Sequence, residues 1–84
     1  MKISFKLYAS LTDHLPAEAR RGNRMELEVA DGATIASTIA PFGMPPQLVH
    51  LVLVNGVFVP PERRATHLLV EGDVLAIWPP IAGG

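Results

Sequence analysis

The residues of this chain that most clearly suggest a chemical reaction are the two glycines at its end, Gly83 and Gly84. They follow Pro-Pro-Ile-Ala at 79–82. Glycine allows close backbone approach, so a narrow channel admits a diglycine end and excludes ordinary C-termini. A carboxylate is a poor electrophile, but adenylation with ATP makes it reactive. Attack by a sulfur donor then leaves a thiocarboxylate, whereas attack by an amine gives an isopeptide conjugate. We predict that Gly84, with Gly83 beside it, is the reactive group.

The five residues before the glycines are expected to aim them at a partner. Trp78 precedes a proline, which favours an extended conformation. Pro79 and Pro80 favour polyproline II, a stiff conformation without internal hydrogen bonds. Ile81 is suited to an apolar hole in a partner, and Ala82 is small enough for a narrow passage. We therefore predict a partner-binding tail that begins at Trp78.

The elements that must position this tail are read from the hydrophobic pattern. Apolar and polar residues alternate over 2–8 and 25–29, which predicts two half-buried strands joined by a long polar connection. A continuous apolar run at 51–54 predicts a central strand covered on both faces. Asn55-Gly56 is a strong tight-turn signal. A short return strand at 57–59 and a last strand at 74–78 complete the set.

One short helix is predicted between the second and third strands. Thr34 is a suitable N-terminal cap. Ile35, Ile39 and Phe42 then share one helical face. Pro41 shortens the helix because proline interrupts its hydrogen bonding, and Gly43 is suited to the C-terminal stop.

The element order predicts an α+β domain, with one mixed sheet packed against one main helix. If the first and last strands lie parallel at the sheet centre, the arrangement is the β-grasp, or ubiquitin-like, fold. We expect a β-grasp domain over residues 1–78 and an extended reactive tail over residues 79–84.

Composition limits the classes of function. The chain has 84 residues, no cysteine and a net charge of -1, which argues against nucleic-acid binding. No apolar stretch approaches the roughly 20 residues of a membrane span, and no signal peptide is evident, so we expect a cytoplasmic protein. Hydrophobic residues make up 49% of the chain, in addition to seven glycines. Such a small domain cannot bury all of them, which predicts an apolar partner surface.

The other polar residues are expected to be structural. Asn55-Gly56 is interpreted as a turn and not as a site. The three histidines lack metal-ligand spacing, and no catalytic triad or phosphate loop is visible, so we expect no metal, no cofactor bound by this chain and no catalysis by the chain alone. Acidic residues are interpreted as turn and surface positions, and three arginines as a solvated loop. These residues are His14, His50 and His67; Asp13, Glu18, Asp31 and Asp73; and Arg20, Arg21 and Arg24.

The stretch EGDVLAIWPPIAGG at 71–84 resembles the end of the bacterial ubiquitin-like sulfur carriers. That family includes the small subunit of molybdopterin synthase and the thiamine-pathway sulfur carrier. The Gly-Asp pair before the last strand and the Pro-Pro-x-x-Gly-Gly ending look most like the molybdopterin synthase small subunit. Tyr8-Ala9 and Val54-Asn55-Gly56 are also similar. The resemblance covers essentially the whole chain, but its specificity lies in these last fourteen residues.

The resemblance implies a pathway and its partners. An ATP-using adenylating enzyme would activate Gly84, and a sulfur donor protein would supply the sulfur of the thiocarboxylate. The tail would then enter the large catalytic subunit of a molybdopterin synthase-like complex and deliver sulfur to the molybdenum cofactor precursor. In this scheme the catalytic groups belong to the partner, and ATP is used by the activating enzyme.

Other assignments stay open at this stage. Residues 60–70 and the Ile-Ala-Gly-Gly end look at least as much like the thiamine carrier, whereas the longer N-terminal region favours the molybdopterin relative. Pro41 and Pro45-Pro46 match neither. A carrier for tRNA thiolation, a ubiquitin-like protein modifier and a plain interaction module are the alternatives.

Overall fold

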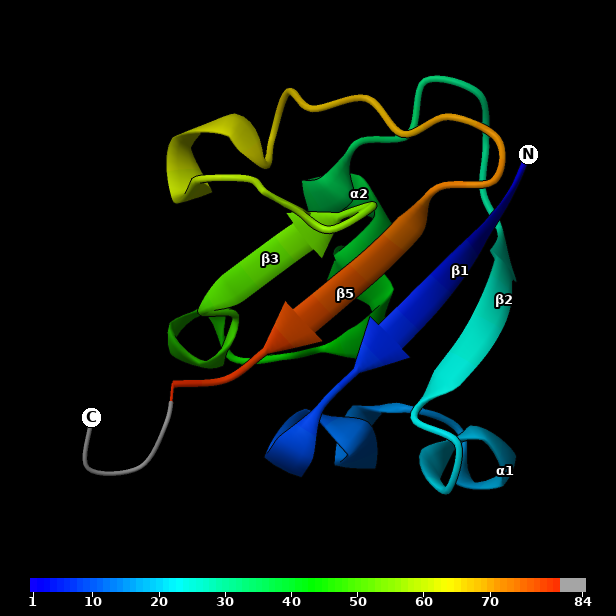
Figure 1. Cartoon of the computed structure of the whole chain (residues 1–84), viewed down its shortest axis with the longest axis vertical. Coiled ribbons are helices and arrows are strands. Elements are labelled where there is room, and N and C mark those ends of the chain that lie inside the picture. Colours follow the sequence, from blue (N-terminus) through cyan, green and yellow to red (C-terminus); the bar gives the residue numbers. More distant parts are fainter. Residues whose placement is uncertain (81–84) are drawn as a thin grey trace.

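In the computed structural model, which describes residues 1–80, a five-stranded mixed sheet carries helix α2 across one face (Figure 1). No helix in this part of the chain is long and apolar enough to cross a membrane. The elements, in chain order, are β1 (Lys2–Leu7), a 3-10 helix (Ala9–His14), α1 (Ala17–Arg20), β2 (Arg24–Glu28), α2 (Ile35–Ile39), 3-10 turns at Ala40–Phe42 and Pro46–Leu48, β3 (Leu51–Val54), β4 (Val57–Phe58), a 3-10 turn at Pro61–Arg63, and β5 (Val74–Trp78).

The strands lie in the order β2-β1-β5-β3-β4. The two central strands, β1 and β5, are parallel, with Ser4 opposite Val74 and Leu7 opposite Ile77. The other pairs are antiparallel. This arrangement confirms the predicted β-grasp fold, with the first and last strands side by side at the sheet centre.

The core lies between the sheet and α2. Phe5 and Leu7 of β1 are fully buried there, because alternate side chains of a strand point to the same face. Leu75 and Ile77 of β5 are equally buried. Phe42 closes one end of the core, with its ring centroid 4.6 Å from that of Phe5.

Helix α2 begins and ends as its sequence predicts. The Thr34 hydroxyl accepts a hydrogen bond from the Ser37 amide at 3.1 Å, and the Thr34 amide donates to the Ser37 hydroxyl at 2.9 Å. These reciprocal bonds satisfy backbone donors that the first helical turn leaves free. Near Pro41 the helix tightens into a 3-10 turn, and Gly43 ends it at a φ of 67°. Both the cap and the stop are therefore confirmed.

The segment between β1 and β2 is more ordered than the polar loop expected from the sequence. It contains a 3-10 helix and α1, and Leu11 and Leu15 are almost completely buried. Their i, i+4 spacing anchors the segment to the core. Arg20 is exposed, but its guanidinium donates to the carbonyls of Leu15 and Asp13. Arg24 lies within β2, so the arginine cluster is not simply a solvated loop.

The prediction that the third strand is covered on both faces is wrong. In β3, Val52 and Val54 are buried, whereas Leu51 and Leu53 are only half-buried. The helix covers one face of the sheet, and the other face meets solvent. A four-residue apolar run thus marks a strand near the sheet centre without implying a second covering layer.

Thr38 and Thr34 provide a matched pair of stability tests on α2. Among residues 1–80 the buried Thr38 hydroxyl has no hydrogen-bond partner, and the residue is 6% exposed. Thr38→Val is expected to raise the free energy of unfolding by about 1 kcal/mol, because it removes an unsatisfied polar group. Thr34→Val is expected to lower it by about 1 kcal/mol, because it removes the cap. Urea denaturation measures both changes, and a destabilised Thr38→Val protein would contradict the assignment.

Candidate functional site

The end of β5 is the place where the chain leaves the sheet, and both neighbouring segments fix it. The Tyr8 amide donates to the Ile77 carbonyl at 3.1 Å, and the His50 amide donates to the Trp78 carbonyl at 3.2 Å. The Tyr8 and Trp78 rings are stacked, with centroids 4.0 Å apart and planes 4° apart. Trp78 is therefore held by its backbone and its ring immediately before Pro79.

Arg64 supports the segment that contacts Trp78. Its Nε donates to the Val59 carbonyl at 3.1 Å, and its two terminal nitrogens donate to the carbonyls of Val49 and His50 at 3.0 Å each. Partial burial lowers the pKa of this guanidinium, and nearby Glu62 acts in the opposite direction. The planar Arg64 guanidinium thus links the turn after β4 to residues 49 and 50, just before β3.

The predicted tail residues fall on both sides of the limit of the described structure. Trp78 and Pro79 are half-buried, and Pro80 is exposed. Ile81, Ala82, Gly83 and Gly84 lie outside the described residues, so the predicted reactive group and the division at residue 78 remain predictions. What the structure adds is the fixed point from which the tail begins.

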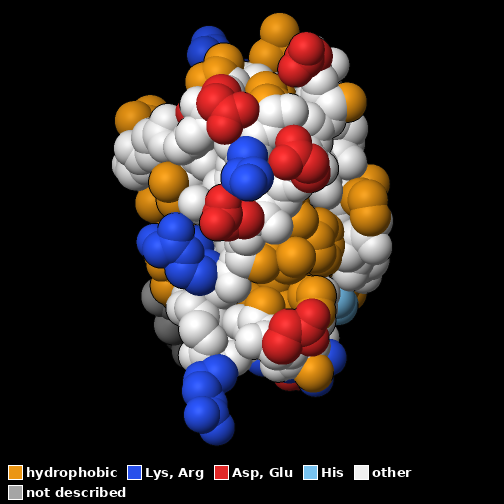
Figure 2. All heavy atoms as spheres, turned by 90° about the vertical axis from the view of Figure 1, so that its right-hand side faces the viewer, with side chains coloured by type: hydrophobic (Ala, Val, Ile, Leu, Met, Phe, Trp, Pro, Cys, Tyr) orange, Lys and Arg blue, Asp and Glu red, His pale blue; other side chains and the backbone are white. Residues whose placement is uncertain are grey.

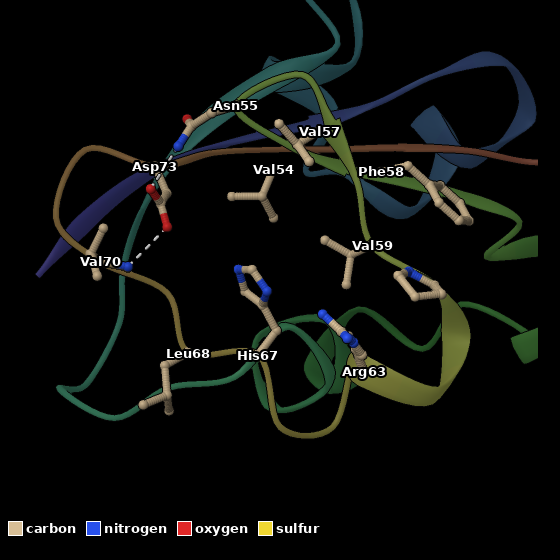
Figure 3. A pocket seen from close by; sticks show the side chains of 11 residues that line it. Val54, Asn55, Val57, Phe58, Val59, Arg63, His67, Leu68, Val70 and Asp73 are labelled. Carbon is tan, nitrogen blue, oxygen red and sulfur yellow. Dashed lines mark hydrogen bonds between the residues drawn. The ribbon is translucent and has the colours of Figure 1, made fainter.

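A second feature is an apolar groove of about 420 Å³ between the β3–β4 hairpin and the segment 67–70 (Figure 3). Val57 on one side is 67% exposed, and Leu68 and Val70 on the other are each 60% exposed. Buried Val54 and Val59 form part of its lining. Exposed aliphatic side chains from two separate segments meet here, as expected for a surface that contacts a partner.

Asp73 closes one end of this groove and is not the surface residue that the sequence suggested. It is 5% exposed, and its two carboxylate oxygens accept from the Asn55 side chain and the Val70 amide at 2.9 Å each (Figure 3). The Asn55 amide oxygen accepts from the Val74 amide. Asn55 and Gly56 have φ values of 52° and 83°, which confirms the turn. Asp73 is thus a buried structural carboxylate that joins the β3–β4 turn to the segment before β5.

Arg63 and His67 also line the groove. Arg63 is exposed, whereas both oxygens of the buried Asp73 carboxylate accept hydrogen bonds within the fold. Over residues 1–80, no group of three or more histidine, aspartate or glutamate side chains could hold a metal ion. The described residues therefore hold the end of β5 at a fixed position and expose an apolar groove that could contact a partner.

The comparisons with known proteins agree with this architecture. A family model described as Mut7-C ubiquitin matches residues 1–82. The chain belongs to the Mut7-C ubiquitin family. No curated protein matches this member of the family significantly.

Solved structures share the fold of this Mut7-C ubiquitin protein. SAMP1, the small archaeal modifier protein 1 from Haloferax volcanii, is 22% identical with a TM-score of 0.68, covering 100% of both chains. A putative molybdopterin converting factor subunit 1 from Pyrococcus furiosus is 20% identical with a TM-score of 0.68, covering 96% of this chain and 99% of that one.

A third structure is a complex of subunits 1 and 2 of the molybdopterin-converting factor from Helicobacter pylori. The matching chain of that complex is 16% identical to this protein with a TM-score of 0.61, and the match covers 100% of this chain and 100% of that one. At these identities the likeness shows the fold alone. The first two structures are archaeal, so the fold does not support a specifically bacterial origin for this Mut7-C ubiquitin protein.

The Tyr8–Trp78 stack can be tested by a double-mutant cycle. Tyr8→Ala and Trp78→Ala are expected to show a coupling of about 0.5–1.5 kcal/mol in the free energy of unfolding, because stacked rings stabilise each other beyond their burial. Chemical denaturation of both single variants and the double variant measures it. A cycle between Tyr8→Ala and Phe58→Ala serves as the control and should give almost none. Strict additivity in the first cycle would show that the stack does not hold the strand end.

The groove can be tested by polar substitution. Val57→Ser and Leu68→Ser are expected to leave the free energy of unfolding within about 0.5 kcal/mol of the parent, because both side chains are already exposed. The two changes together should lower the fluorescence of a bound hydrophobic dye. Ala65→Ser, an exposed neighbour outside the groove, is the matched control. Equal dye binding by the parent, the double variant and Ala65→Ser would contradict an apolar binding surface at this groove.

Proposed function

We propose that this protein is a ubiquitin-like sulfur carrier that acts through the Gly84 carboxylate. A carboxylate oxygen attacks the α-phosphate of ATP in an activating enzyme, and pyrophosphate leaves. A hydrosulfide equivalent from a sulfur donor then attacks the carbonyl carbon, and AMP leaves with the oxygen. The product is a thiocarboxylate in which one oxygen has been replaced by one sulfur. This proposal requires that the carboxylate of Gly84 be free.

The observation that carries the proposal is the way the last central strand ends. Trp78 is held by the Tyr8 ring and by the His50 amide, directly before the sequence Pro-Pro-Ile-Ala-Gly-Gly. Two prolines that follow a fixed point limit the directions in which the chain can continue, which lowers the entropy cost of inserting its end into a partner. In this proposal the chemistry belongs to the enzymes that receive the tail.

The proposed recipient is the large subunit of a molybdopterin synthase-like complex. The support is the fold of subunit 1 of the molybdopterin-converting factor, which in the Helicobacter pylori structure is in complex with subunit 2. In the proposed complex, Gly83 and Gly84 pass through a channel too narrow for side chains. Pro79 to Ala82 lie against the partner, and the thiocarboxylate donates sulfur to a precursor of the molybdenum cofactor.

A second candidate function is that of a protein modifier, favoured by the similarity to SAMP1. In that case a lysine amine of another protein attacks the same acyl-adenylate, AMP leaves, and an isopeptide bond forms. Both candidates share the activation step, and they differ in the nucleophile that follows it.

Intact mass spectrometry separates the candidates. After incubation with ATP, the adenylating enzyme and a sulfide source, we expect a mass gain equal to the replacement of one oxygen by one sulfur, located in the C-terminal peptide. Lysine conjugates without this gain would identify a modifier. No change with an active enzyme, or a chain that continues past Gly84 in its host, would overturn both candidates.

Deletion of Gly84 is expected to reduce sulfur loading to background, because the carboxylate then no longer fits the activating site. Ala65→Ser, an exposed position far from the tail in sequence, is the control and should load normally. Circular dichroism should show both variants folded. Normal loading of the shortened protein would contradict the role assigned to the diglycine end.

A further inference from the structure

Within the described residues, 1–80, backbone groups on the outer edge of β2 have no hydrogen-bond partner. In the pairing with β1, the Val29 amide donates to the Met1 carbonyl at 2.8 Å, and the Leu7 amide donates to the Asn23 carbonyl at 3.1 Å. Facing residues of an antiparallel pair alternate between bonded and non-bonded. The odd-numbered residues of β2 therefore bond to β1, and the backbone groups of Arg24, Glu26 and Glu28 point away from the sheet.

A groove lies beside this edge on the helix side. It has a volume of about 400 Å³ and is lined by Leu27 and Val29 on one side and by Thr38 and Pro41 on the other. Met25 and Leu27 of β2 are only half-buried. The space-filling view of the β2 side shows hydrophobic side chains gathered in one area with acidic and basic groups around them (Figure 2). A strand added to this edge would cover the apolar area.

Two of the three exposed side chains of β2 on the open face, Glu26 and Glu28, are acidic, and the third is Arg24. Glu26 and Glu28 alternate with the apolar residues of β2, so their side chains lie on the open face of the sheet, and Asp31 follows in the turn. The amino group of Met1 lies 3.4 Å from Glu28, and within residues 1–80 Glu26 and Asp31 form no ion pair. Opposite charges on adjacent strands stabilise pairing.

We propose that the free edge of β2 binds an extended segment of a partner protein in which apolar and basic residues alternate. Its backbone pairs with Arg24, Glu26 and Glu28, which is strand addition to an exposed sheet edge. Its apolar side chains enter the groove against Leu27 and Pro41. Its lysine or arginine side chains lie on the open face beside Glu26 and Glu28.

The inner edge of β2 already accepts a strand of this type. On that side, β1 carries Ile3 and Phe5 on the helix face, and Lys2 stands opposite Glu28 on the open face. The outer edge offers the same alternation of glutamates, Glu26 and Glu28, with Met25 and Leu27 to a second strand. Because β1 separates β2 from β5, binding here leaves the end of β5 accessible. The edge site is therefore independent of the proposed chemistry at Gly84.

A synthetic seven-residue peptide that alternates lysine and isoleucine, acetylated and amidated at its ends, tests this site on the full chain. We expect NMR titration to shift the amide signals of residues 24–29 and of the groove, and to protect the Glu26 and Glu28 amides from hydrogen exchange. A peptide with glutamate in place of lysine should bind at least tenfold more weakly. N-methylation of the peptide amides that face β2 should weaken binding to a similar extent.

The matched variants reverse the charge. Glu26→Lys with Glu28→Lys should weaken binding of the lysine peptide at least tenfold and favour the glutamate peptide, whereas Glu62→Lys, on the far side of the sheet, should change neither. This exchange of preference is a readout that misfolding does not produce. Absence of binding at millimolar peptide, signal shifts confined to the groove beside β4, or equal binding of both peptides would each overturn the proposal.

Discussion

The parallel pairing of β1 with β5 is the constraint on which the rest of the structure depends. It places residues from the two ends of the chain, such as Ser4 and Val74, next to each other at the sheet centre. The intervening chain must then cross one face of the sheet, and α2 lies within that crossover. Because these two strands contribute most of the fully buried side chains of the sheet, loss of β5 would remove the centre of the core. Folding must also close a long loop before this pairing forms, which is costly in entropy.

The same pairing determines how the chain presents its surfaces. With β1 and β5 in the middle, β2 and β4 become the two edges. The β4 edge is only two residues long and adjoins the apolar groove closed by Asp73, while the β2 edge is longer and carries Glu26 and Glu28. The end of β5 lies between them, held by Tyr8 and His50. The strand order thus places the start of the tail, the groove beside β4 and the free edge of β2 at three separate positions on the molecule.

Local sequence patterns predicted the features that depend on neighbouring residues. The strand alternation, the Thr34 cap, the Gly43 stop and the Asn55-Gly56 turn all follow from spacing or from the conformational preference of one residue. The fold class followed from their order together with the resemblance. The Mut7-C ubiquitin match and the solved structures agree with that assignment.

The features that were missed depend on partners distant in sequence. Asp73 resembled a turn residue, but its burial is compensated by Asn55, 18 positions away. Leu11 and Leu15 stood in a polar segment whose one-turn apolar spacing becomes informative only when a sheet is available to bury it. The stack of Tyr8 on Trp78 required the pairing of β1 with β5 before either ring had a neighbour. The chemistry of the tail therefore stays a prediction from residue types, whereas tertiary contacts determine how the residue before the tail is held.

The stacked rings at the end of β5 have an optical consequence. Trp78 is the single tryptophan of the chain and Tyr8 is the single tyrosine, so nearly all near-ultraviolet absorption and emission arises from one pair of rings at the base of the tail. Any protein that closes over the first residues beyond β5 changes the solvent around the indole and therefore its emission. The molecule thus carries its own fluorophore at the position from which the proposed tail begins.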